Sequence, residues 1–549
     1  MRARPWLLIV VLLAVVVLTS AAVWVAVPAP DRNETSATPR SPTSAPTSTV
    51  SAVTAASAAA ECGPPATRAV TSPIVVSLPP GRPFTVGAIA ASSWRQPAVA
   101  DVSWQLQFSG FMYMAPLAAR AQRDGSKAVL AALVGQVAAF HVQNPDVGSS
   151  ADGWDEGTAQ RRLQTENCLY ALTKDRRLTA GMIADANVQL GSRYAGPPFH
   201  VVHNHGLMAN LQLLRAGQLL GVDAWVATAA RRLKAEAPLA FSASGTTWEQ
   251  SSQYQGVNVY LWRRAADMVA ALPGHSDAAA AIRAVTVRAA IVRQWLTEPD
   301  GDTVQIGDAD RLPGAAGAQS GLVFRDDLAG FVVGRSSWTD RAATFYTLRY
   351  GPPRRAHGHE DRGGVTWSTR GARVLVGAGR FGYDLRSSFA QWARSAASAN
   401  VAVPDGAAID TAARVRIERI SAGPQTTRWR LTDRLYGTDH VRTVDISDAA
   451  ATLRVSDTYA GGVTFRQHWH LDPTWRLVSA PASGQSMVFR DAGGRVLRIT
   501  TTGRLALLLK GSRAPIAGWH ANVLGSPVPS YEIVLRSKGP TLTTTFTVR

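Results

Sequence analysis

The stretch KAVLAALVGQVAAFHV, residues 127–142, sets the pattern for the first half of the chain. Its apolar side chains, among them Val129, Leu130, Leu133 and Val134, recur three and four positions apart. This spacing gathers them on one face of a helix, so it predicts an amphipathic α-helix that packs against a core.

Segments of the same kind extend from about residue 104 to residue 274. We expect further helices to begin near Gly206, Asp223, Glu249 and Asp277, with no strong strand signal between them. The apolar positions do not repeat in heptads, which disfavours a coiled coil. Residues 73–300 are therefore expected to form a domain of helical hairpins.

After Asp302 the pattern changes to short β-branched or aromatic runs separated by Gly, Pro, Asp and Asn. The runs are 322–324, 331–333, 343–350, 374–376, 427–431, 453–457, 464–471 and 531–535. Many short strands of this kind indicate an antiparallel β-sandwich. The predicted fold class is therefore α+β and multidomain, with a helical domain followed by a large antiparallel β-sandwich over residues 301–549.

Residues 6–27 form a nearly unbroken apolar run preceded by Arg2 and Arg4. A run of about 20 apolar residues spans a bilayer, and positive charge before it places residues 1–5 in the cytoplasm. A cleaved signal peptide is the alternative, because Ala-x-Ala-like sequence occurs near the end of the run. Residues 28–72, rich in Ala, Ser, Thr and Pro, are expected to form a flexible tether. The rest of the chain is then held outside the cell membrane by a single-pass anchor, or is secreted.

The formal net charge of +18 comes almost entirely from Arg. Such a charge favours a polyanionic partner, which leaves nucleic acid, anionic lipid, a cell-wall polymer or an acidic glycan. Export of the chain argues against nucleic acid. Cys62 and Cys168 are the only cysteines, and in an oxidising compartment they either pair or stay as two thiols.

Two polar clusters stand out in the helical half. Asn204 and His205 lie at the start of an expected helix, where backbone N–H groups favour an anion, although Asn204 also suits a helix cap. Residues 248–254, WEQSSQY, place Glu249 and Tyr254 before an apolar helix. That run predicts either a substrate groove or, for Tyr254, part of the core face of the helix.

The third cluster is RRAHGHED, residues 354–361, between two expected strands. On an extended strand His357, His359 and Asp361 project to one side and Glu360 to the other. A His-x-His pair suits either metal binding or acid–base chemistry. A solvated polar loop is the third interpretation.

The order and spacing of these clusters resemble the heparinase II/III-like superfamily of polysaccharide lyases, including its alginate and oligoalginate lyases. The residues that carry the resemblance are Asn204, His205, Tyr254, His357, His359 and Asp361, supported by residues 249–251 (EQS), 305–310 (QIGDAD) and 465–471 (FRQHWHL). The resemblance covers most of the chain after the tether.

The resemblance implies an incomplete α/α toroid packed on the β-sandwich, and cleavage of uronic-acid-containing glycans by β-elimination. It assigns Asn204 and His205 to neutralising the uronate carboxylate. It assigns Tyr254 and His357 to the proton transfers, leaving open which is base and which is acid.

The resemblance also suggests groups that bind substrate. Tyr383 matches the position of a second catalytic Tyr in some branches. Arg161, or its neighbour Arg162, and Glu249 are expected to hold substrate, although an Arg on a helix surface is the simpler interpretation.

The sequence departs from the family at a structural zinc site. His359 is the retained ligand, but the expected Asp and His positions hold Gly377 and Ala399. Because tight zinc sites need three or four ligands, we expect zinc binding to be weak or absent. The orientation of His357 is then left to other contacts, among which Asp361 is our candidate.

The leading hypothesis is an extracytoplasmic lyase acting on an acidic polysaccharide. A glycan-binding or cell-envelope assembly protein that has lost turnover is the alternative, supported by the missing zinc ligands. A glycoside hydrolase that uses Glu249 and Asp361 as its carboxyl pair is a weaker alternative.

Overall fold

The computed structural model describes residues 60–549, apart from 79–80, 90, 96–98, 100, 147, 151, 196–202, 385, 424–425 and 482–483. The predicted cytoplasmic segment, residues 1–5, the predicted anchor, residues 6–27, and residues 28–59 of the predicted tether lie outside this range. Within it, no helix combines the length and the apolar character needed to cross a membrane.

The chain divides into two compact units. The helical unit holds the residues up to Pro238 together with Leu261–Arg283, and the strand-rich unit holds Leu239–Tyr260 together with Ala284–Arg549. The chain passes from one unit to the other after Pro238, and again within helices α10 (Ser252–Ala270) and α11 (Ser276–Trp295).

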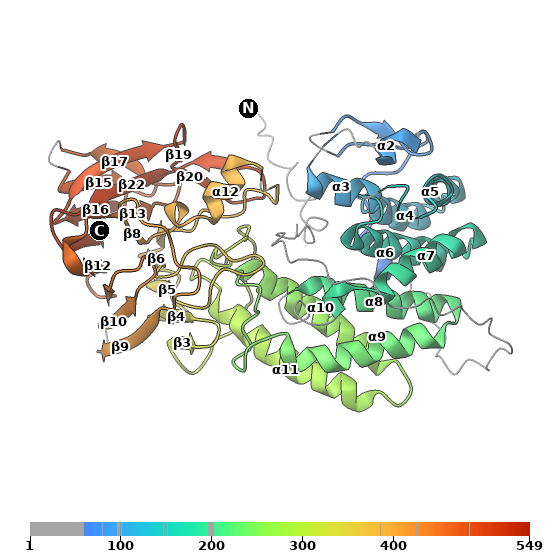
Figure 1. Cartoon of the computed structure of the whole chain (residues 1–549), viewed down its shortest axis with the longest axis horizontal. Coiled ribbons are helices and arrows are strands. Elements are labelled where there is room, and N and C mark those ends of the chain that lie inside the picture. The colour runs from blue at the N-terminus through green and yellow to red at the C-terminus, as the bar shows by residue number, and fades with distance from the viewer. Residues whose placement is uncertain are drawn as a thin grey trace, which may run out of the picture. The chain divides into compact units, whose positions relative to one another are not determined.

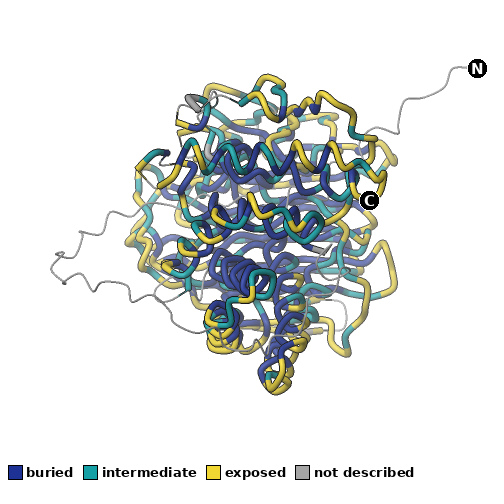
Figure 2. Tube along the Cα trace, turned by 90° about the vertical axis from the view of Figure 1, so that its right-hand side faces the viewer, coloured by how far each residue is buried: buried dark blue, intermediate teal, exposed yellow. Residues whose placement is uncertain are grey.

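The helical unit is built from sequential helices that pack in pairs, such as α6 (Glu156–Thr173) with α7 (Thr179–Leu190) and α8 (Asn204–Leu220) with α9 (Asp223–Glu236) (Figure 1). Its earlier helices and strands are β1 (Val75–Val76), β2 (Phe84–Thr85), α2 (Ala91–Arg95), α3 (Val102–Ser109), α4 (Met114–Arg123) and α5 (Lys127–Gln143). The predicted helical pattern is confirmed. Figure 2 shows helices that are buried along one side and exposed along the other, as an amphipathic pattern requires.

The ends of these helices follow from local chemistry. The side chain of Asp155 caps α6 by accepting a hydrogen bond from the amide of Gly157 at 2.9 Å. Helix α8 ends at Gly221, which takes the left-handed conformation (φ +70°) that glycine adopts without strain.

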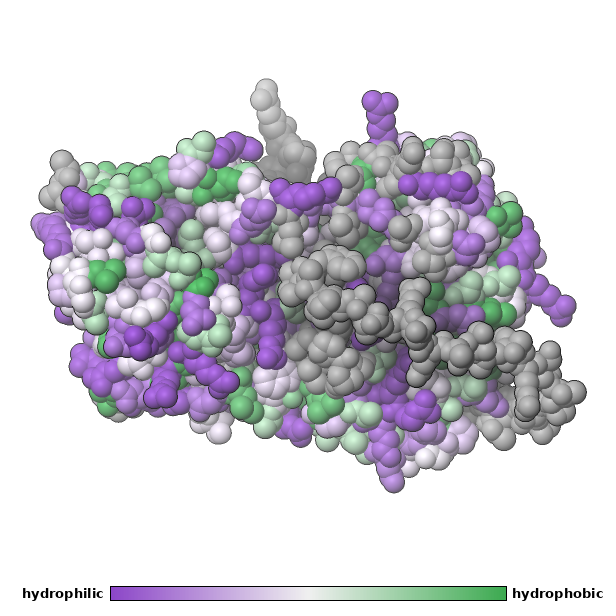
Figure 3. All heavy atoms as spheres, viewed as in Figure 1, coloured by the Kyte–Doolittle hydropathy of each residue, from purple (hydrophilic) through white to green (hydrophobic). Residues whose placement is uncertain are grey.

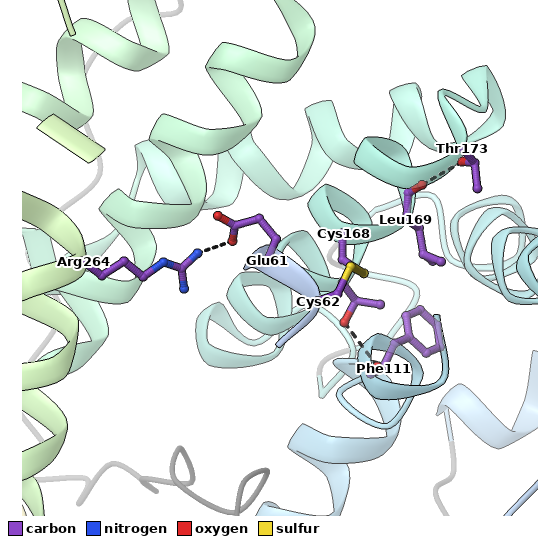
Figure 4. The surroundings of a disulfide bond; sticks show 8 residues. Glu61, Cys62, Phe111, Cys168, Leu169, Thr173 and Arg264 are labelled. Carbon is purple, nitrogen blue, oxygen red and sulfur yellow. Dashed lines mark hydrogen bonds and ion pairs between the residues drawn. A yellow bond between two sulfur atoms is a disulfide. The ribbon is translucent and has the colours of Figure 1, made fainter. Parts of the chain in front are cut away.

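A disulfide and a buried ion pair fasten the first described residues to the helical unit (Figure 4). Cys62, in the short 3-10 helix η2 (Ala60–Cys62), is joined to Cys168 on α6, which settles the question that the sequence left open. The neighbouring Glu61 is 1% exposed and pairs with Arg215 on α8 and Arg264 on α10. Burial raises the pKa of Glu61, but the two guanidinium groups outweigh it and hold the pKa below its ordinary value.

The strand-rich unit contains three main antiparallel sheets. The five-stranded sheet runs in the order β3 (Val323–Asp326), β4 (Phe331–Arg335), β5 (Phe345–Arg349), β6 (Val365–Thr369), β7 (Ala372–Leu375). The eight-stranded sheet has the order β14 (Arg476–Ser479), β15 (Ser486–Arg490), β16 (Val496–Thr501), β23 (Thr541–Val548), β12 (Thr452–Tyr459), β11 (His440–Ser447), β10 (Thr426–Asp433), β9 (Arg416–Ala422). The four-stranded sheet has the order β17 (Arg504–Lys510), β22 (Tyr531–Arg536), β13 (Phe465–His470), β8 (Ala402–Pro404).

These sheets share one apolar core, which confirms the predicted large antiparallel β domain. Tyr346 on β5, Trp429 on β10 and Trp469 on β13 belong to the same buried cluster. In β10 to β12 buried and more exposed residues alternate, as the period of two in a strand requires. Hydrophilic side chains are accordingly spread over the face of this unit seen in Figure 3.

The remaining described elements of this unit are short. They are α12 (Ser388–Arg394), β18 (Ser512–Arg513), β19 (Ile516–Ala517), β20 (Trp519–Ala521) and β21 (Pro527–Pro529). Helix α12 follows the five-stranded sheet in the chain, and its last residue, Arg394, enters the site described next.

Candidate active site

Tyr254 and His357 form the centre of a buried cluster in the strand-rich unit. Tyr254 lies in the first turn of α10, and His357 lies in the loop between β5 and β6. Their rings are stacked, with centroids 3.5 Å apart and planes 6° from parallel. Both are almost fully buried, at 0% and 2% exposure. The structure therefore brings together the two residues for which the sequence predicted proton transfer.

The polar run at residues 248–254 fastens the start of α10 to a later segment. Ser251 Oγ donates a hydrogen bond to the carbonyl of Asp308 at 2.8 Å. The side-chain oxygen of Gln253 accepts one from the amide of Asp310 at 2.7 Å. These contacts explain the density of polar residues in the run, for which the sequence had predicted a substrate groove.

A glycine permits the backbone to close around His357. The amide of His357 donates to the carbonyl of Glu249 at 3.2 Å, and the amide of Asp308 donates to the carbonyl of His357 at 2.8 Å. Between them Gly307 has φ +61°, and a Cβ there would lie 2.5 Å from the carbonyl oxygens of both Gln250 and His357. Only glycine fits position 307, where the backbone segments of Gln250 and His357 approach so closely.

Asp308 is the central acceptor of the cluster. Its carboxylate lies 3.1 Å from Nδ1 of His357 and 3.1 Å from Nε2 of His359. Arg394, at the end of α12, donates from Nη2 to the same carboxylate at 3.0 Å. Asp308 is 1% exposed, so three donors satisfy a charge that water does not reach.

Burial and neighbouring charges together set the protonation states of Asp308 and His357. Burial raises the pKa of Asp308, but Arg394 and the hydrogen bonds from the two histidines outweigh it and hold the pKa well below 3.8. Burial also lowers the pKa of His357 below 6.5, against the opposing effect of Asp308. At neutral pH the pair is therefore an ionised carboxylate and a neutral imidazole.

The hydroxyl of Tyr254 continues into a second chain of contacts. It lies 3.1 Å from the hydroxyl of Tyr383. Arg380 donates from Nη1 to the Tyr383 oxygen at 3.2 Å and is itself paired with Asp310 through Nε at 3.2 Å. Tyr383, predicted to bind substrate, thus lies directly against Tyr254.

Both tyrosines are held in their protonated form. Burial, with the neighbouring Tyr383 hydroxyl, raises the pKa of Tyr254 well above 10. Burial and the charge of Asp308 raise the pKa of Tyr383 to about 12. Tyr254 is consequently a proton donor at neutral pH.

Glu249, also predicted to bind substrate, lies beside His357. Its Oε2 is 3.5 Å from His357 Nε2, and its Oε1 accepts from Asn258 Nδ2 at 2.8 Å. Glu249 is 2% exposed. A carboxylate at this place stabilises His357 when the ring gains a proton.

Residues 354–361 lie between two strands, as expected, and form an irregular loop between β5 and β6, so the alternation of an extended strand does not apply to them. His357 and His359 nevertheless converge, since both reach Asp308. The candidate for orienting His357, Asp361, instead lies 3.4 Å from Nε of Arg349. Asp308 takes the place that we had expected for Asp361.

The residues present do not fit the zinc site of the resemblance. Gly377, His359 and Ala399 line a common pocket, but of these three positions only His359 offers a side-chain ligand, and its Nε2 faces Asp308. A Cβ on Gly377 would lie 2.8 Å from the carbonyl oxygen of Gln305, so the backbone leaves little room for the expected Asp. A single imidazole ligand does not make a tight zinc site.

The other predicted site residues lie in the helical unit. Asn204 and His205 occupy the first turn of α8 and are buried, and the His205 ring packs against Tyr194 with centroids 4.8 Å apart. Arg161 on α6 is 1% exposed and donates to the carbonyl of Gly157 at 2.9 Å. Their substrate contacts stay predictions.

Among the described residues one His/Asp/Glu trio is close enough to share a cation, namely His141, Glu166 and Asp185. Arg162 pairs with Asp185 through two nitrogens and supplies positive charge there. Burial raises the pKa of Glu166 to about 8 and lowers that of His141 to about 4. His141 Nε2 lies 2.6 Å from Glu166 Oε1, so a proton held by this carboxyl group can be shared with the ring.

Sequence reasoning missed Asp308, Arg394 and Arg380 as members of the site. Asp308 lies in QIGDAD, residues 305–310, which supported the resemblance, so its position beside the two histidines was the available signal. Nothing in the sequence distinguishes Arg394 from the many other arginines.

Comparison with known proteins agrees with this architecture. Residues 313–549 match the family model described as Heparinase II/III-like, C-terminal. A crystal structure of heparinase III matches with a TM-score of 0.70 and 14% identity, covering 85% of this chain and 80% of that one. A mutant of heparan sulfate lyase HepC from Pedobacter heparinus matches with a TM-score of 0.62 and 17% identity, covering 86% of this chain and 81% of that one. Comparison with curated proteins gives no match.

At these identities the likeness to solved structures concerns the fold. It confirms the helical region followed by a large antiparallel β domain. The resemblance inferred from the sequence is confirmed as well, since residues 313–549 match the model of the heparinase II/III-like C-terminal domain.

Proposed function

We propose that the chain is an extracytoplasmic polysaccharide lyase that cleaves a uronic-acid-containing glycan by β-elimination. The observation that carries the proposal is the stacked pair of Tyr254 and His357, buried beside two charged networks in a heparinase-like fold. The net charge of +18 favours an acidic polymer. Heparan sulfate lyase HepC, which shares the fold, is named for such a polymer.

β-Elimination needs a base for the proton on C5 and an acid for the leaving oxygen on C4. His357 is neutral at neutral pH because burial lowers its pKa, so it suits the base. Tyr254 is protonated because burial raises its pKa, so it suits the acid. When Tyr254 gives up its proton, Tyr383 can donate to its oxygen, since Arg380 already donates to Tyr383.

Three further elements belong to the proposal. Asn204 and His205 neutralise the substrate carboxylate as charge develops on it. The helical unit adopts the incomplete α/α toroid of the family. The apolar run at residues 6–27 anchors the chain in the cell membrane, or is removed on secretion.

The test is a screen of the purified protein against heparan sulfate, alginate, hyaluronan and polyglucuronate, followed by the ultraviolet absorbance of a 4,5-unsaturated uronate. We expect Tyr254→Phe and His357→Ala to lower kcat by about 100-fold or more, because each removes one proton transfer. Tyr260→Phe is the matched control, since Tyr260 lies on the same helix and is 63% exposed. Turnover that is unaffected by both substitutions would contradict the assignment.

A glycan-binding or cell-envelope assembly protein without turnover is the second candidate, favoured by Gly377 and Ala399 at the expected zinc positions. Tight binding of an acidic glycan with no cleavage by the wild-type protein would support it. A saturated product would instead support a glycoside hydrolase. The hydrolase hypothesis is weakened because its two carboxyl groups have separate partners: Glu249 lies against His357, and Asp361 lies against Arg349.

A further inference from the structure

We propose that Asp308 and Arg394 are positioning residues that fix the tautomer and orientation of His357. The residues present do not fit the zinc site of the resemblance, so the orientation of His357 depends on other contacts. This inference rests on the proposed lyase function for its kinetic consequences. Its structural part, the tautomer of His357, stands independently.

The argument begins with what Asp308 can accept. An ionised carboxylate accepts hydrogen bonds and donates none. Nδ1 of His357 lies 3.1 Å from one of its oxygens and Nε2 of His359 lies 3.1 Å from the other. Each of those nitrogens must therefore carry a hydrogen, so the contact places a hydrogen on Nδ1 of His357 and one on Nε2 of His359.

The consequence for His357 concerns its other nitrogen. With the hydrogen on Nδ1, the lone pair of neutral His357 is on Nε2. Nε2 is buried and forms no hydrogen bond within the described part of the chain. A base in this tautomer is ready to take a proton at Nε2, and the nearest carboxylate, Glu249 at 3.5 Å, stabilises the imidazolium that results.

Arg394 makes this arrangement stable. Its guanidinium donates to Asp308 at 3.0 Å and is 6% exposed, so it compensates the carboxylate without competition from water. Its carbonyl also accepts from the amide of Glu360 at 2.9 Å. One residue at the end of α12 thus holds both Asp308 and the loop that carries His357 and His359.

The kinetic test compares Asp308→Asn, Asp308→Glu, Arg394→Met and Arg394→Lys. We expect Asp308→Asn to lower kcat by about 100-fold or more with KM changed less than about threefold, because substrate still binds while the base is misoriented. The conservative Asp308→Glu should have a kcat at least about tenfold higher than that of Asp308→Asn. In the same way, Arg394→Lys should have a kcat at least about tenfold higher than that of Arg394→Met. A merely structural role would lower the folded fraction and leave kcat per folded molecule unchanged.

The chain offers a matched control for loss of a buried carboxylate. Asp457 in the sandwich accepts from His440 Nε2 at 2.9 Å and from Arg442 Nε at 2.7 Å, so Asp457→Asn breaks a similar network away from Tyr254 and His357. It should destabilise the fold and leave kcat unchanged. An equal fall in kcat for Asp457→Asn and Asp308→Asn would overturn the positioning role.

The spectroscopic test uses 15N-labelled histidine and the imidazole nitrogen shifts, with His357→Gln and His359→Gln for assignment. We expect the Nδ1–H form for His357, the Nε2–H form for His359, and a change of the His357 signal in Asp308→Asn. An Nε2–H form of His357 in the wild-type protein would overturn the inference. This measurement needs no turnover. A wild-type protein that gives no unsaturated product would contradict the proposed function, while the nitrogen spectrum would still decide the tautomer of His357.

Discussion

At the scale of the residue, a glycine decides how closely His357 approaches the start of α10. Gly307 combines φ +61° with two carbonyl oxygens 2.5 Å from the position of a Cβ. We expect Gly307→Ala to lower the free energy of unfolding by about 2 kcal/mol or more, because left-handed backbone costs about 1 kcal/mol in Ala and the contacts add to it. It should also lower kcat, since the His357 carbonyl must move.

The control is Gly437→Ala, where φ is +77° but nothing lies within 4 Å of the new Cβ. It carries the backbone penalty without the collision. Urea unfolding of both variants, together with kcat, separates the two effects. Equal destabilisation by the two substitutions would show that the crowding at Gly307 is relieved at little cost.

The residue types of the site were predictable, and their partners were not. The spacing of His357 and His359 indicated acid–base chemistry or a metal, but periodicity assigned Asp361 to the same face. In the structure a loop turns both histidines to Asp308, almost fifty residues earlier in the chain. A pattern of alternation describes a strand and gives no information on an irregular loop.

At the scale of the element, strands β10, β11 and β12 place a buried His between two carboxylates. His440 lies 2.9 Å from Asp433 and 2.9 Å from Asp457. Burial lowers its pKa, but the hydrogen bonds to the two carboxylates outweigh this and raise the pKa above 6.5. A raised pKa contributes stability that is fully present below pH 6.5 and is lost as the pH rises through the folded-state pKa.

We therefore expect the difference in unfolding free energy between the wild-type protein and His440→Gln to be largest below pH 6.5 and to shrink at higher pH. Guanidinium chloride titrations of both proteins at several pH values measure that difference, and groups common to both cancel. A gap that widened towards alkaline pH would contradict the prediction.

The sequence predicted the strand at 453–457 from its β-branched residues, but not this network. Antiparallel pairing places Arg442 directly opposite Asp457, and alternation buries both. Which strand pairs with which depends on the whole sheet, and local propensity carries no record of it.

At the scale of the whole molecule, the change of pattern after Asp302 predicted a helical region followed by a large β domain. It did not predict that residues 239–260 belong with the strands. They do so because polar side chains such as Ser251 and Gln253 bind the backbone of residues 308–310. Helical periodicity is the same on either side of such a boundary, so only the tertiary contacts reveal it.

The disulfide between Cys62 and Cys168 gives a prediction at the same scale, because it closes a loop with a sequence separation of 106 residues in the helical unit. Cross-linking a loop of about 100 residues is expected to stabilise the fold by about 2 to 5 kcal/mol, chiefly by restricting the unfolded chain. Replacing both cysteines by serine should lower the midpoint of the helical unit's calorimetric transition, and adding reductant to the wild-type protein should reproduce the shift. The double variant is its own control, since reductant should leave it unchanged. Glu61 still pairs with Arg215 and Arg264 in that variant. A further fall in the midpoint on adding Glu61→Gln would show that these ion pairs hold the segment independently of the disulfide. Equal midpoints for the oxidised wild-type protein and the double variant would contradict the predicted stabilisation by the disulfide and show that the ion pairs hold the segment alone.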